Sequence, residues 1–101
     1  MPKYVFKKPF KFEETEFSEI DLDLEGLTGR DLSVVKRHWA GKGNFSAVIA
    51  TDTDYCVLIA CHAAKQPFEF ADALPARDYT QIAQMVQNFL LGVDSESVTT
   101  Q

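Results

Sequence analysis

Two cysteines and two histidines are the residues of this chain best suited to chemistry. Cys61 and His62 are adjacent, and a cysteine beside a histidine base could form a nucleophilic pair. On a helix, however, Cys56 and Cys61 stand about 140° apart around the axis, and His62 points to another face. His38 is distant in the sequence, and no CxxC pair is present. We therefore predict small buried cysteines, with no metal site, no cofactor and no enzymatic activity.

Seven acidic residues lie between Glu13 and Glu25 without a basic residue among them. They lack the Asp, Asn and Gly spacing of a calcium loop, and their alternation with apolar residues distributes them along one face of a strand. The glycines form no GxGxxG motif and precede no Lys-Ser/Thr pair, so no phosphate loop is indicated. We interpret the carboxylates as a solvated strand face and the glycines as turn residues.

The composition fits one small globular domain. The chain has 101 residues, of which 46% are hydrophobic and 25% charged, and a single core is normally built from about 100–200 residues. The net charge of −5 disfavours contact with nucleic acid, which needs a clustered basic surface. The apolar runs are too short to span a membrane, and the two cysteines and the missing leader sequence predict a cytoplasmic protein.

The first 25 residues have the pattern of an antiparallel β-hairpin. A basic stretch with four lysines precedes the acidic run, so opposite charges would face each other across the strands. Apolar residues occupy even positions in both arms, for example Phe6 and Leu22. A tight turn at Glu14-Thr15 would put these two residues on opposite faces. We therefore expect one extra residue, in a three-residue loop or in a β-bulge near Ser18, with Pro9 at an edge or an irregularity.

After Leu27 the apolar spacing changes to that of helices. Thr28 to Asp31 resembles a capping box, and Gly41 and Gly43 end the helix that follows. The next segments are a helix or loop at 45–50, a buried helix at 55–64 with Thr51 or Thr53 as its cap, one turn at 68–74, and an amphipathic helix at 79–90. We predict an α+β fold in which the hairpin, or three short strands, packs on three to four helices. Residues 1–92 form one domain, and residues 93–101 form a disordered tail.

Aromatic residues are more numerous than one small core requires. The chain has eight Phe, three Tyr and one Trp, and Phe89, Leu90 and Leu91 cannot all face the core from one helix. Exposed apolar clusters of this kind mark protein contacts. We therefore nominate four partner-binding residues: Trp39, Phe68, Phe70 and Leu91.

The order of these segments resembles the tail assembly chaperone family of long-tailed phages. The matching segments are residues 8–12 (KPFKF), 17–22 (FSEIDL), 27–32 (LTGRDL), 58–61 (LIAC), 74–79 (LPARDY) and 86–90 (VQNFL). They cover roughly residues 8 to 91, whereas 42–50 has no counterpart and Glu14-Thr15 replaces a glycine common in the family's hairpin turn.

The resemblance implies a non-catalytic chaperone in the host cytoplasm that is absent from the mature virion. Such a protein binds the long helical tape measure protein, keeps it soluble and delivers it for tail tube assembly. Contact with the tail tube protein and self-association stay open. The alternatives are a structural tail or head–tail connector protein and, with less support, a small enzyme that uses Cys61 and His62.

Overall fold

The computed structural model describes residues 3–46 and 48–92 and confirms the predicted α+β architecture. A two-stranded antiparallel hairpin is followed by four α-helices and two short 3-10 helices. In chain order the elements are β1 (Lys3–Phe12), β2 (Thr15–Asp21), η1 (Leu24–Gly26), α1 (Gly29–Gly41), η2 (Ile49–Thr51), α2 (Thr53–Ala63), α3 (Phe70–Ala73) and α4 (Ala76–Leu90). The predicted tail at 93–101 lies outside the described residues.

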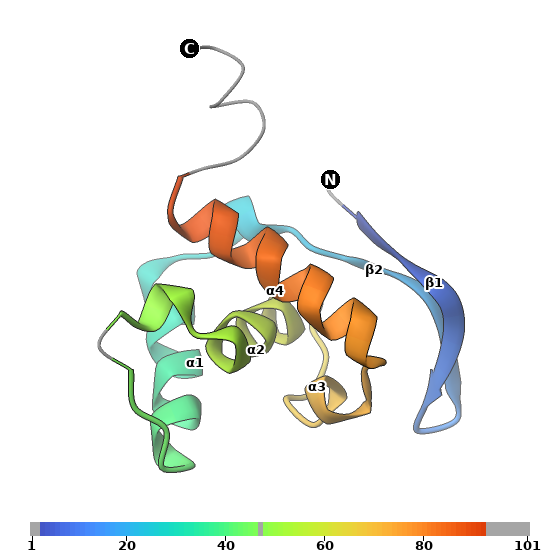
Figure 1. The fold of residues 1–101 in the computed structure, drawn as a ribbon, viewed down its shortest axis with the longest axis horizontal. Helices are drawn as coiled ribbons and strands as arrows, with labels where there is room; N and C mark the ends of the chain where they lie inside the picture. Colours follow the sequence, from blue (N-terminus) through green and yellow to red (C-terminus); the bar gives the residue numbers. More distant parts are fainter. Residues whose placement is uncertain (1–2, 47, 93–101) are drawn as a thin grey trace.

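Helix α2 forms the centre of the molecule. Every residue from Tyr55 to Cys61 is buried, as expected of a helix that is apolar nearly all round. Helices α4 and α1 both pack against α2 (Figure 1). Ile82 and Val86 of α4 and Val35 of α1 are fully buried in the core. The hairpin lies beside α4 and contacts it through β1.

The hairpin register differs from our prediction in its turn and in its count of extra residues. The turn has two residues, Glu13 and Glu14, so that Phe12 pairs with Thr15. The required change of register does occur opposite Ser18, between the pairs Val5–Glu19 and Phe10–Phe17. At this point four residues of β1, 6–9, lie opposite one residue of β2, so β1 has three extra residues where we predicted one. Three extra residues meet the requirement as well as one does, because any odd number keeps the apolar side chains of both arms on one face.

The irregular segment of β1 contains Pro9, as predicted, because proline cannot donate a hydrogen bond to the ladder. The opposing charges of the two arms also meet as expected. Lys3 Nζ lies 3.0 Å from Glu19 Oε2, and the Cα of Lys11 faces that of Glu16.

Phe70 attaches the hairpin to the helices. It begins α3 and is fully buried, and its ring lies 5.6, 5.2 and 5.0 Å from those of Phe10, Phe12 and Phe17. Edge-on and tilted contacts at these distances are favourable for aromatic rings. The aromatic residues of both hairpin arms therefore close around one side chain of the helical layer.

The helix caps follow the sequence closely, with one correction. The capping box of α1 forms between Thr28 and Asp31, and Gly92 has the positive φ of 71° typical of the residue after a helix end. The cap of α2 is Asp52, whose side chain accepts a hydrogen bond from the Tyr55 N–H, so our choice of Thr51 or Thr53 was wrong. Asp52 also accepts from Trp39 Nε1 at 3.0 Å, and this second donor favours the aspartate.

Candidate functional site

The two cysteines are buried side chains, as predicted. Cys56 and Cys61 are 0% and 1% exposed. Burial raises the pKa of Cys56 to about 11 and that of Cys61 to about 12, because the thiolate loses its hydration in an apolar interior. Since the thiolate is the reactive form, neither sulfur is suited to act as a nucleophile at neutral pH.

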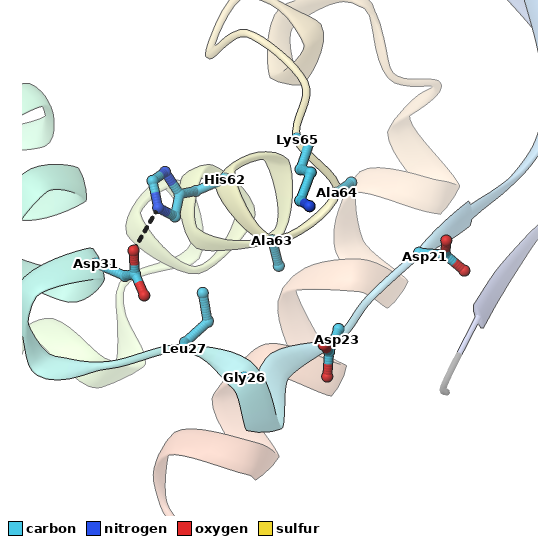
Figure 2. A pocket seen from close by; sticks show the side chains of 9 residues that line it. All are labelled: Asp21, Asp23, Gly26, Leu27, Asp31, His62, Ala63, Ala64 and Lys65. Atoms are coloured by element: carbon cyan, nitrogen blue, oxygen red, sulfur yellow. Dashed lines mark hydrogen bonds and ion pairs between the residues drawn. The ribbon is translucent and has the colours of Figure 1, made fainter.

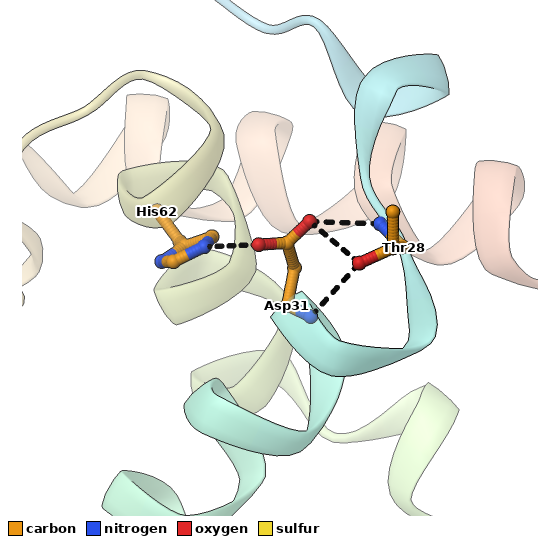
Figure 3. A network of polar contacts seen from close by, with 3 residues as sticks. All are labelled: Thr28, Asp31 and His62. Carbon is orange, nitrogen blue, oxygen red and sulfur yellow. Dashed lines mark hydrogen bonds and ion pairs between the residues drawn. The ribbon is translucent and has the colours of Figure 1, made fainter.

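His62 joins a polar network with the capping box (Figure 3). Its Nε2 lies 2.9 Å from Asp31 Oδ1. The other carboxylate oxygen, Oδ2, accepts hydrogen bonds from the Thr28 N–H at 2.8 Å and from the Thr28 hydroxyl at 3.1 Å. One carboxylate thus caps α1 and links it to the last turn of α2.

The network favours the ionised form of Asp31. The hydrogen bond from His62 is the largest cause that lowers the pKa of this carboxyl, and the Thr28 N–H is the next. The sequence identified the cap, because Thr28 and Asp31 are three residues apart. It could not identify His62, which is 31 residues further along the chain.

An acidic cleft of about 370 Å³ lies beside this network (Figure 2). Asp31 and His62 lie on one side of it, Asp21 and Asp23 on the other, and Lys65 also lines it. The carboxylates do not converge: within residues 3–46 and 48–92, no three His, Cys, Asp or Glu side chains are grouped so as to hold a metal ion.

The cleft is also poorly equipped for acid–base catalysis. A histidine base activates a hydroxyl or thiol that it hydrogen-bonds, while a carboxylate orients the ring. Asp31 could orient His62, but the Thr28 hydroxyl bonds to the carboxylate and not to the imidazole. The arrangement is that of a helix cap with an interhelical link.

Two of the four nominated contact residues are not exposed, which corrects the sequence prediction. Trp39 is 4% exposed and donates to Asp52, and Phe70 is 0% exposed among the hairpin rings. Phe68 is half-buried and stacks on His38 with ring centroids 4.2 Å apart. Leu91 is 46% exposed, as the crowding of apolar residues at the end of α4 predicted.

Other exposed apolar side chains lie outside the nominated set, and besides Val5 on the hairpin two of them stand close together in the sequence. Phe45 is 89% exposed and Val48 is 57% exposed, both in the connection between α1 and α2. Val48 directly precedes η2, which contacts α4, the helix that ends just before Leu91. We use the name apolar loop surface for the exposed side chains of Phe45 and Val48 in this connection, taken together with that of Leu91 after α4. The sequence missed its first two members because isolated apolar residues in a connection give no periodic signal.

Comparisons with known proteins provide no family for this chain. No family model, no curated protein and no solved structure matches it. Among the described residues, no helix is both long enough and apolar enough to cross a lipid bilayer. The resemblance to tail assembly chaperones therefore stays a prediction from the sequence.

Proposed function

We propose that this protein is a non-catalytic assembly chaperone of a long-tailed phage. It binds the tape measure protein in the host cytoplasm, keeps it soluble and delivers it for tail tube assembly, without entering the mature virion. The observation that carries the proposal is the order of six short segments between residues 8 and 91 that resembles the chaperone family. No one of the segments is specific alone, and their order and spacing are what support the assignment.

The apolar loop surface supports a binding role. A tape measure protein presents long amphipathic helices, and such helices bind to other proteins through their apolar faces. Phe45, Val48 and Leu91 offer exposed apolar contact area to such a partner. The net charge of −5 would keep a complex with an aggregation-prone partner in solution.

The chemistry of the candidate site is consistent with a role that needs no catalysis. Both thiols are buried and protonated at neutral pH, and His62 is engaged with the carboxylate that caps α1. The cysteines belong to the core, and His62 links α2 to α1 through Asp31, so both roles are structural.

Co-expression with the tape measure protein, which the proposal expects to be encoded by a very long, helix-rich reading frame immediately downstream, tests the proposal. We expect the wild-type chain to raise the soluble fraction of that protein severalfold and to co-purify with it. Phe45→Ser and Leu91→Ser should lower both yields, because they remove apolar contact area. Val5→Thr is the matched control, since Val5 is 66% exposed but lies on the hairpin. A partner that stays equally insoluble with and without this chain would contradict the proposal.

A comparison of purified virions with the lysate separates the chaperone from a structural subunit. A structural tail or head–tail connector protein would be found in purified virions, whereas a chaperone would be present in the lysate and absent from the particles. Immunodetection of this chain in both fractions distinguishes the two functions, and strong enrichment in the particles would favour the structural alternative.

A further inference from the structure

A second cleft, of about 430 Å³, lies between β1 and the start of α4 and has the opposite charge to the first. We call it the basic cleft. Three exposed cations line it: Lys7 and Lys8 from β1 and Arg77 from α4. Pro9, Phe10 and Pro75 supply its apolar part. The chain has a net charge of −5, so a concave surface lined by three cations differs in sign from the protein as a whole.

The hairpin irregularity creates this concentration of charge. Lys7 and Lys8 belong to the stretch of β1 that has no partners in the β2 register. Lys3, in the regular part of the ladder, pairs with Glu19 of its own hairpin. Among the described residues, Asp78 is the one carboxylate that lines the basic cleft. It is 2% exposed and accepts a hydrogen bond from the Tyr4 hydroxyl at 2.5 Å. The exposed charge of the basic cleft is therefore positive.

The tip of the same hairpin carries complementary charge. We define the acidic tip as the turn residues Glu13 and Glu14, both of which are exposed, because Glu16 already faces Lys11 across the hairpin. Glu13 and Glu14 both have positive φ, 49° and 69°, in a turn where Asn and Gly are the usual residues. The turn projects beyond the helices (Figure 1), so these carboxylates are accessible to another molecule.

The acidic tip cannot reach the basic cleft of its own chain. Residues 10–12 pair regularly with β2 and hold the strand extended, and a strand rises about 3.3 Å per residue. Glu13 is therefore held roughly 15 Å from Lys8 along the strand direction. We propose that the acidic tip of one copy docks in the basic cleft of a second copy, which makes a head-to-tail contact between identical chains.

Such a contact is heterologous, because one copy contributes its acidic tip and the other its basic cleft. Each added copy leaves one tip and one cleft free, so association continues until a ring closes or a filament forms. The contact involves neither the apolar loop surface nor the tape measure protein. It can therefore succeed or fail independently of the proposed function.

Sedimentation of the full chain at low and high salt tests the contact. We expect concentration-dependent oligomers at low salt that dissociate as the ionic strength rises, since the Debye length falls from about 30 Å at 0.01 M to about 3 Å at 1 M. The double variants E13K/E14K and K7E/K8E should each weaken association by about tenfold or more, because two attractive ion pairs become repulsive. K36E/R37E makes the same charge change as K7E/K8E on the exposed face of α1 and should leave association unchanged.

Charge exchange makes the test specific for the two surfaces. A mixture of E13K/E14K with K7E/K8E should associate, because each tip then meets a cleft of opposite charge in the other variant, and the quadruple variant should associate with itself. Circular dichroism checks that each variant folds. A wild-type chain that stays monomeric at all salt concentrations overturns the proposal. Association lost in K7E/K8E but kept in E13K/E14K also overturns it and indicates that another acidic segment occupies the basic cleft.

Discussion

Replacement of Phe70 by alanine should be among the most destabilising single changes in this protein. Its side chain is fully buried and contacts the rings of Phe10, Phe12 and Phe17 at 5.0–5.6 Å. Truncation of a buried phenylalanine to alanine costs about 3–5 kcal/mol. The three ring contacts, worth about 0.5–1.5 kcal/mol each beyond area burial, place Phe70→Ala near the upper end of that range.

Urea unfolding measures this cost. A domain of this size has a free energy of unfolding of about 5–15 kcal/mol, so Phe70→Ala should remove a large part of it. Phe70→Leu keeps most of the apolar volume and should cost only about 1–2 kcal/mol, which remains measurable if the alanine variant fails to fold. The matched control is Phe45→Ala, which removes an 89% exposed ring and should change the free energy of unfolding by less than about 0.5 kcal/mol.

Two spectroscopic probes test whether the hairpin and the helices unfold together. Trp39 fluorescence reports on α1 and α2, whereas far-UV circular dichroism reports on all elements. If Phe70 joins the hairpin to the helices, both probes should show the same lowered midpoint, because the domain unfolds as one unit. A Phe70→Ala variant that is no less stable than Phe45→Ala would refute the packing described here.

Three further predictions concern the polar and thiol groups. Since the folded pKa of Asp31 lies below its ordinary value of 3.8, its contribution is present above that pH and is lost as the pH falls through the lower folded pKa. The urea midpoint of the wild type should therefore exceed that of Asp31→Asn at pH 7 and approach it as the pH falls below 3.8, and a pH-independent difference would contradict this. A rise in the pKa of Cys61 from 9.0 to about 12 lowers its thiolate fraction about a thousandfold. Iodoacetamide at pH 8 should thus label it in urea and leave it unmodified in the folded chain, and equal labelling would be evidence against burial. Trp39→Phe removes the donor to Asp52 and should lower the free energy of unfolding by about 1–2 kcal/mol by circular dichroism, while an unchanged value would show that this bond contributes nothing.

Local patterns made much of the fold predictable. The Thr28 cap, the glycine that follows the end of α4 and the buried helix around Cys61 each depend on residues close together in sequence. Capping preferences and apolar periodicity describe such short-range relations well. The same patterns favoured Thr51 or Thr53 over Asp52, because the second donor that selects Asp52 comes from Trp39 in another helix.

Long-range contacts account for the parts of the site that the sequence did not predict. The excess of aromatic residues was interpreted as exposed surface, but three hairpin rings enclose Phe70 and leave it no accessible area. His62 has an ion-pair partner 31 residues away, and Arg77 joins Lys7 and Lys8 only when α4 lies beside β1. No spacing rule along one chain relates residues this far apart.

The hairpin irregularity has two roles that deletions can separate. Tyr4 before it, Phe6 at its start, and Phe10 and Phe12 after it all face inward, and only an odd number of extra residues allows this. Deleting Lys7 and Lys8 together leaves one extra residue, which is an ordinary β-bulge. This variant should keep the fold while losing the lysines of the basic cleft.

Deleting Lys8 alone leaves an even number of extra residues and should turn Phe10 and Phe12 towards solvent. Two half-buried rings are then exposed, which costs about 2 kcal/mol. The shorter deletion should therefore be the more destabilising one in urea, against the usual expectation that a larger deletion does more damage. If the double deletion is instead the less stable, the odd count of residues is not what keeps the aromatic face together, and the lysines themselves stabilise the hairpin.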